Sequence, residues 1–184
     1  TLSPIGQSVT SIAPSNVNLK ALEIRFETIC SHMLRSTKTA LSIGDRATII
    51  AGVGTNDTAH SVVAARAAAD AGAHGVMAVS PYYNRPPQEG LVRHFHAIAD
   101  ATDLPMLTYD IPKRTGVAIE LETFLRIAEH PRIIANKDAK GDLDASQWGM
   151  ASTDLAWYCG DDLLNLPMLA VGCAGMISVV GHVV

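Results

Sequence analysis

The chain has 184 residues, a net charge of −4, 48% hydrophobic residues and 17% charged residues. This composition is that of a globular protein with a sizeable core, and it excludes an intrinsically disordered chain. The weakly acidic charge gives no reason to expect nucleic acid or an anionic membrane as a partner. No apolar run reaches the ~18 residues that a membrane-spanning helix needs.

Residues 1–17 are polar and lack the basic start and apolar stretch of a signal peptide. The three cysteines, Cys30, Cys159 and Cys173, lie far apart and do not have the spacing of metal ligands. We therefore expect reduced cysteines that serve as packing residues, no bound metal, and a cytoplasmic location.

Residues 1–46 differ in pattern from the rest of the chain. Residues 1–18 are rich in Ser, Thr, Pro and Asn, which is typical of a loop. Residues 19–34 carry apolar side chains at helical spacing and predict one helix. No strand is expected before residue 47, so we interpret 1–46 as an irregular N-terminal segment.

From residue 47 onward, short apolar runs alternate with longer amphipathic ones. The apolar runs predict six strands, at 47–54, 75–82, 105–112, 132–139, 155–162 and 175–183. Between them we predict helices at 58–71, 88–101, 120–130 and 163–171, and the weaker pattern at 144–152 indicates another. Most of the strands are continuously apolar, which is typical of strands covered on both faces.

Strict alternation of strand and helix implies a parallel sheet with right-handed crossovers, in a doubly wound sheet or in a (β/α)8 barrel. Polar residues at several strand ends favour the barrel. A barrel needs eight strands and typically ~250 residues. We therefore predict the α/β class and a (β/α)8 barrel, incomplete in this chain, with about six βα units in the partial barrel of residues 47–184.

Lys137 is the first candidate catalytic residue. If 132–139 is a strand, Ile133, Ala135 and Lys137 share one face, and Lys137 lies near its C-terminal end. In a parallel barrel that end is the catalytic rim. Desolvation there would lower the pKa of the amine and make it a nucleophile toward a carbonyl group. The structural alternative is a surface lysine that ends a strand.

Two further candidate residues belong to the preceding strand and to the segment directly after it. Tyr109 shares a face with Leu107 near the strand's C-terminal end, where a phenol can pass a proton to a carbinolamine hydroxyl. A buried tyrosine with a satisfied hydroxyl is the structural alternative. Arg114 is expected in the loop after this strand, where a guanidinium can hold a carboxylate by two hydrogen bonds. It is also compatible with a solvated surface arginine.

Two other motifs do not support a site. The run Gly52-Val53-Gly54 resembles a dinucleotide-binding motif, but Asp57 stands where the third glycine is needed. His94 and His96 have an HxH spacing, but on a helix their side chains point to different faces, which argues against a metal site.

Several segments together resemble the dihydrodipicolinate synthase and N-acetylneuraminate lyase family. The matching runs appear in the order of the family and cover residues 44–184; they are IIAGVGTN (49–56), SPYYNRPPQEG (80–90), YDIP (109–112), KDAKGD (137–142), YCGDD (158–162) and GMISV (175–179).

The resemblance implies a (β/α)8 barrel in which a lysine condenses with pyruvate. Lys137 matches the Schiff-base lysine, Tyr109 the proton-relay tyrosine, and Tyr83 the tyrosine that reaches into the neighbouring subunit's site. Arg114 matches the residue that receives the carboxylate of the aldehyde substrate. Two backbone positions that line the pyruvate pocket are matched by Gly160 and Ile177.

The reaction implied by the resemblance is an aldol-type condensation of pyruvate with aspartate semialdehyde on the way to lysine and diaminopimelate. It implies no metal or organic cofactor, and it implies a homodimer or homotetramer because Tyr83 acts across a subunit interface. Arg114 favours the synthase branch of the family over the lyases.

The chain departs from the family pattern in two respects that bear on activity. The Gly-Thr-Thr-Gly-Glu segment, whose threonines link the two tyrosines and bind the pyruvate carboxylate, does not occur in residues 1–46. Asn136 stands before the lysine where an apolar residue is usual, and it is expected to face the surrounding helices. Two alternatives therefore stay open: a non-catalytic truncated paralogue or fragment, and another 2-keto acid aldolase or lyase.

Overall fold

A computed structural model describes residues 48–180, so the segment 1–46 and its predicted helix lie outside the described residues. The described part of the chain contains six strands in one parallel sheet, in the order β1-β2-β3-β4-β5-β6. Each lies within a predicted range: β1 (Ile50–Gly52), β2 (Gly75–Val79), β3 (Met106–Asp110), β4 (Ile133–Asp138), β5 (Ala156–Cys159) and β6 (Gly175–Met176).

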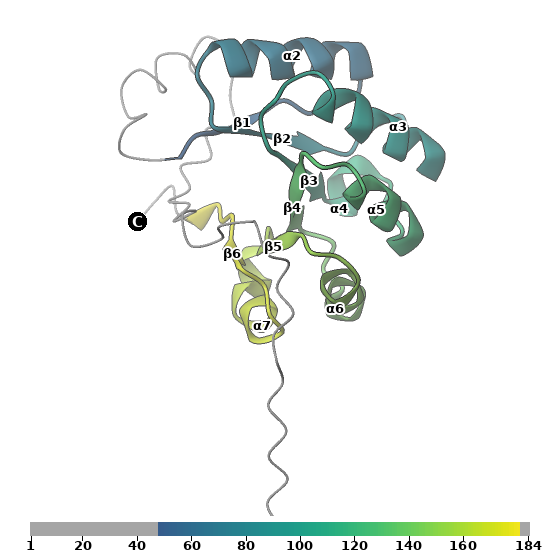
Figure 1. Ribbon diagram of the computed structural model, residues 1–184. Helices are drawn as coiled ribbons and strands as arrows, with labels where there is room; N and C mark the ends of the chain where they lie inside the picture. The colour runs from purple at the N-terminus through teal and green to yellow at the C-terminus, as the bar shows by residue number, and fades with distance from the viewer. Residues whose placement is uncertain (1–47, 181–184) are drawn as a thin grey trace, which may run out of the picture.

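The helices that connect these strands lie along the convex side of the curved sheet (Figure 1). They are α2 (Thr58–Asp70), α3 (Gln88–Ala99), α4 (Pro112–Thr115), α5 (Leu121–Ala128), α6 (Leu143–Ser152) and α7 (Asn165–Ala170), the last preceded by the short 3-10 helix η2 (Asp162–Leu164). A doubly wound sheet reverses its strand order and carries helices on both faces. The sequential order seen here confirms the predicted barrel, of which six strands form part.

Local chemistry explains where several helices begin and end. Asp57 caps α2 by accepting a hydrogen bond from the His60 backbone N–H at 2.7 Å. Asp142 caps α6 in the same way, with the Ala145 N–H as donor at 3.1 Å. The short helix α4 ends at Gly116, whose φ of 78° lies in the left-handed region that glycine adopts without strain.

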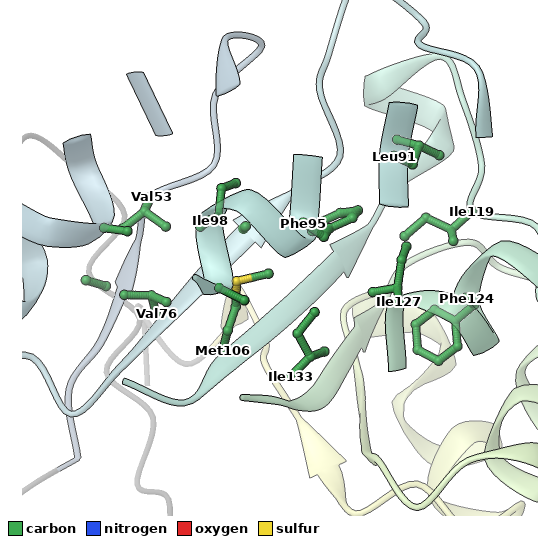
Figure 2. Close-up of a cluster of buried hydrophobic side chains, with 14 of the residues drawn as sticks. Val53, Val76, Leu91, Phe95, Ile98, Met106, Ile119, Phe124, Ile127 and Ile133 are labelled. Carbon is green, nitrogen blue, oxygen red and sulfur yellow. The ribbon is translucent and has the colours of Figure 1, made fainter. Parts of the chain in front are cut away.

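The main core lies between the sheet and the helices. Figure 2 shows side chains of this cluster, with Val76, Met106 and Ile133 of the strands among residues of the helices and connecting segments. A smaller cluster lies on the opposite, inner face of the sheet and consists of Ile50, Met77, Leu107, Ala135 and Ile177. Neighbours along a strand, such as Val76 and Met77, therefore belong to different clusters, as the two-residue period of a strand requires.

One part of the face prediction is wrong. Ile133 belongs to the helix-facing cluster, whereas Ala135 belongs to the inner cluster. The reason is an irregularity in β4: Met106 pairs with Ile133, but the next residue of β3, Leu107, pairs with Ala135. The extra residue, Ile134, is a bulge that changes the alternation of faces. Ala135 and Lys137 keep the predicted relation because both follow the bulge.

Candidate functional site

A row of side-by-side residues crosses the inner face of the sheet near the carboxyl ends of the strands. Lys137 of β4 pairs with Tyr109 of β3 on one side and with Tyr158 of β5 on the other. Tyr158 in turn pairs with Gly175 of β6. Because partners in a parallel ladder point to the same face, the amine and the two phenols project into the same space.

Lys137 and Tyr109, predicted as candidates from their strand positions, are in contact. The Lys137 Nζ lies 4.2 Å from the centroid of the Tyr109 ring. Lys137 is 8% exposed and Tyr109 is half-buried. A lysine that ends a strand at the surface would be solvated along its whole length, so the burial excludes the structural alternative for Lys137.

Gly160 and Ile177 occupy the next inner row, two residues beyond Tyr158 and Gly175. Ile177 is 3% exposed and belongs to the inner cluster. A Cβ atom on Gly160 would lie 2.8 Å from Cε and 3.0 Å from Cγ of Lys137. The aliphatic stem of Lys137 therefore occupies the space that a side chain at residue 160 would fill. Both Gly160 and Tyr109 thus lie next to Lys137 in the structure.

Tyr83 and Arg114 follow β2 and β3 at the same end of the sheet, and both are exposed. Tyr83 is 91% exposed and has a φ of 75°, which is unusual for a bulky residue. Its neighbour Asn84 donates a side-chain hydrogen bond to the Asn56 carbonyl at 2.8 Å. Arg114 was expected in a loop but lies in α4, a single turn too short to produce a readable helical period.

Tyr158 is a residue of this row that the sequence analysis did not select. Burial raises the pKa of its hydroxyl, and Cys173 adds to that effect. Gly175 accommodates its ring, since a Cβ on Gly175 would lie 3.3 Å from the ring atoms Cδ1 and Cε1. The signal was present in the sequence: Tyr158 lies two residues before Gly160 and must share its face.

Behind the row, the helix-facing side of the sheet carries polar residues in a buried setting. Asn136 faces the helices as predicted, and its Oδ1 accepts a hydrogen bond at 2.8 Å from the hydroxyl of Thr108, its partner on β3. Asp138 accepts hydrogen bonds from the Lys140 N–H and the Ser146 hydroxyl, both at 2.8 Å. Asp110, directly after Tyr109, is 2% exposed, and burial raises its pKa to about 6.

His94 and His96 contact different neighbours, as their helical spacing predicts. His94 Nδ1 lies 2.8 Å from the Thr58 hydroxyl of α2, whereas His96 Nε2 lies 3.2 Å from the Arg126 carbonyl of α5. Within residues 48–180, no group of three or more His, Cys, Asp or Glu side chains has a metal-binding arrangement. Over the same residues, none of the helices has the length and apolar character needed to cross a membrane.

Comparison with known proteins supports one family. The model of the dihydrodipicolinate synthetase family matches residues 31–184. The 4-hydroxy-tetrahydrodipicolinate synthase 2 of Streptomyces coelicolor is 64% identical over 143 residues, which are 78% of this chain and 48% of that protein. The chain thus spans about half the length of the curated relatives that it matches.

Solved structures agree with the sequence comparison. The 4-hydroxy-tetrahydrodipicolinate synthase of Methylacidiphilum fumariolicum SolV superposes with a TM-score of 0.81 at 41% identity, covering 83% of this chain and 52% of that one. A dihydrodipicolinate synthase of Acinetobacter baumannii superposes with a TM-score of 0.78 at 37% identity, covering 83% of this chain and 55% of that one.

Proposed function

The chain belongs to the dihydrodipicolinate synthetase family, and on that basis we propose that Lys137 forms a Schiff base with pyruvate, which then condenses with aspartate semialdehyde. This reaction belongs to lysine and diaminopimelate biosynthesis. The observation that carries the proposal is a buried strand lysine whose Nζ lies 4.2 Å from the ring centroid of Tyr109. The solved A. baumannii relative, a complex with pyruvate, supports the first substrate.

In the proposed first step, Lys137 Nζ attacks the carbonyl carbon of pyruvate and forms a carbinolamine. The carbinolamine hydroxyl leaves as water after it receives a proton, and Tyr109 is the adjacent group that can donate it. The resulting imine, once protonated, withdraws electrons from the neighbouring methyl group. The protein amine is thus the electron sink, so the proposed reaction needs no metal or organic cofactor.

In the second step, the methyl group loses a proton and the resulting enamine carbon attacks the aldehyde carbon of aspartate semialdehyde. The aldehyde oxygen takes up a proton as the new carbon–carbon bond forms. Attack of water or of an amine on the imine carbon then releases Lys137. We assign Arg114 to the carboxylate of the aldehyde substrate, because its exposed guanidinium lies in α4, directly after the strand of Tyr109.

Pyruvate is proposed to bind along the backbone of Gly160 and Ile177. The absence of a side chain at Gly160 supports this assignment, because any Cβ there would fill the space beside the stem of Lys137. At this level the Ile177 N–H, directly after β6, donates a hydrogen bond to the carbonyl of Cys159 in β5 at 2.7 Å. A pocket wall made of backbone can approach a small keto acid closely.

Tyr83 is proposed to act in the site of a neighbouring subunit, which implies a homodimer or homotetramer in the cytoplasm. Two features support this role: Tyr83 is 91% exposed, and a φ of 75° is retained by a bulky residue at a cost in free energy. Sedimentation velocity of the wild-type protein and of Tyr83→Ala tests the assembly. A wild-type protein that is monomeric at all concentrations would contradict it.

The test of the proposed chemistry is trapping with borohydride. We expect incubation with pyruvate and borohydride to attach a reduced pyruvyl group to Lys137, located by peptide mapping. Lys137→Arg should remove the adduct, whereas Lys113→Arg, the same change at an exposed lysine of α4, should leave it unchanged. Adduct on several lysines in both variants would contradict a specific amine site.

The alternative is a non-catalytic member of the family, and the sequence contains one observation in its favour. Residues 1–46 lack the Gly-Thr-Thr-Gly-Glu segment that supplies two threonines to the family's proton relay. A folded protein that forms no adduct would support this alternative. An adduct that forms with other 2-keto acids at a rate equal to that with pyruvate would instead favour a different aldolase of the family.

A further inference from the structure

A buried ion pair lies behind the row that contains Lys137 and Tyr109. Lys140 Nζ is 3.2 Å from Oδ2 of Asp110, and it also donates a hydrogen bond to the Ile119 carbonyl at 2.9 Å. The same Asp110 oxygen accepts a hydrogen bond from the Ile119 N–H at 3.2 Å. The Asp110 side chain is 3% exposed and that of Lys140 is 22% exposed, so the contact is shielded from solvent.

Each partner of this pair is close in sequence to a residue of the proposed site. Asp110 directly follows Tyr109 at the end of β3, and Lys140 comes three residues after Lys137, just beyond β4. Backbone bonding joins the same two segments, since the Ala139 N–H donates to the Asp110 carbonyl at 2.9 Å. Ile119 belongs to the segment that follows α4, the helix of Arg114. One ion pair therefore links the three chain segments that carry Tyr109, Lys137 and Arg114.

We propose that the Asp110–Lys140 ion pair is a positioning device for the proposed active site, which holds Lys137 and Tyr109 in the relative position that imine formation requires. This inference rests on the proposed function. Neither residue touches the reacting atoms, because both side chains lie on the helix-facing side of the sheet or beyond its end, whereas Lys137 and Tyr109 face inward. Asp110 and Lys140 instead fix the positions of the backbone segments that carry Tyr109 and Lys137.

The electrostatics of the pair argue against a role in stability alone. Burial raises the pKa of Asp110 to about 6, and the nearby Lys140 only partly offsets this effect. The neighbouring Asp138 raises the pKa further. The cost of desolvating the carboxylate therefore exceeds its attraction to the lysine, as is common for buried ion pairs. The Oδ1 atom of Asp110 adds to the cost, because it is buried and has no hydrogen-bond partner among the described residues.

The ion pair contributes directional contacts, which fix the relative position of the segments that it joins. A charged hydrogen bond is short and directional, and Lys140 donates to two acceptors that belong to different segments. Imine formation depends on the distance and angle between amine, carbonyl carbon and proton donor, and a displacement of ~1 Å can slow such a step about 100-fold. Loss of the pair should therefore change the rate of the chemical step more than the affinity for pyruvate.

The experiment measures the rate of borohydride-trapped adduct formation on Lys137 as a function of pyruvate concentration. Lys140→Met removes the cation and both of its contacts. We expect the limiting rate to fall about 100-fold while the half-saturating pyruvate concentration changes much less. Lys140→Arg retains a cation with several N–H donors and should restore most of the rate. Asp110→Asn, which retains the shape of the side chain but loses the charge, should slow the reaction in the same direction.

Val92→Ala provides the control for stability. Val92 is a buried core residue of α3 with no part in the site, so its truncation should lower the thermal midpoint and leave the trapping rate unchanged. If the wild-type protein forms no adduct, the proposed function fails. If the wild type reacts, and Lys140→Met and Asp110→Asn react as fast as Val92→Ala, the ion pair has no positioning role and the proposed function stands.

Discussion

Gly160 provides the sharpest test of the site geometry, because a single methyl group changes it. In Gly160→Ala the new Cβ would lie 2.8 Å from Cε and 3.0 Å from Cγ of Lys137, and 3.2 Å from Cβ of Ala139. Carbon atoms pack at about 3.5–4.0 Å, so Cε must move by roughly 0.7–1.2 Å. The Ala139 methyl group is attached directly to the backbone and has no rotamer to change, so most of the movement must come from the lysine.

The expected effect on rate is much larger than the effect on folding. Gly160 is not among the described glycines with a positive φ, so alanine introduces no backbone strain there. Overpacking a buried contact typically costs about 1–3 kcal/mol, and the flexible lysine stem places this substitution at the low end. A displacement of the amine by ~1 Å corresponds to about a 100-fold loss of rate, or about 2.7 kcal/mol of transition-state free energy.

The assay is the rate of Lys137 adduct formation with pyruvate and borohydride, measured beside the thermal midpoint of each variant. Gly90→Ala is the matched control, because it is the same chemical change in α3 and the atoms nearest to its Cβ would belong to Pro86 and Pro87, at 3.3 Å or more. We expect Gly90→Ala to react at the wild-type rate. A Gly160→Ala variant that also reacts at the wild-type rate would refute the inference that the lysine stem occupies this space.

Three further outcomes are expected. Because burial raises the pKa of Asp110 from 3.8 to about 6, the folded state binds a proton more readily than the unfolded state. Lowering the pH from 7 to 4 should therefore stabilise the wild type relative to Asp110→Asn, by about 2 kcal/mol in urea unfolding. His94 behaves in the opposite way, since burial lowers its pKa from 6.5 to about 4 and the folded state binds a proton less readily than the unfolded state. Over the same pH range the free energy of unfolding of the wild type should fall by about 3 kcal/mol relative to that of His94→Gln. Gly149→Ala would place a Cβ 2.4 Å from the Trp157 ring and should lower the free energy of unfolding by about 1–3 kcal/mol, whereas a thermal midpoint equal to that of the wild type would contradict this packing.

The order and type of the elements after residue 47 could be predicted from local patterns. Strands buried on both faces are continuously apolar, and the helices between them repeat their apolar residues with helical spacing. This is why all six strands fall in the predicted ranges. The turn α4 was not predicted, since four residues are too few to show a helical period, and Arg114 was therefore expected in a loop.

The same reasoning could predict most of the residues that face the inner side of the sheet. A two-residue period correctly groups Ala135 with Lys137, and it would have added Tyr158 through Gly160. It fails for Ile133, because the bulge at Ile134 changes the alternation of faces. A bulge depends on how two strands pair, so it cannot be predicted from the sequence of one strand alone.

The sequence by itself determined the kinds of residue at each strand end and the family to which the chain belongs, because motifs and periods are local. Tertiary structure alone decided which side chains meet. It joined Asp110 to Lys140 across two strands, placed the stem of Lys137 against Gly160, and set the phenol of Tyr109 beside the amine. These contacts arise from the register of parallel strands, which is a property of the pairing between segments and not of any one of them.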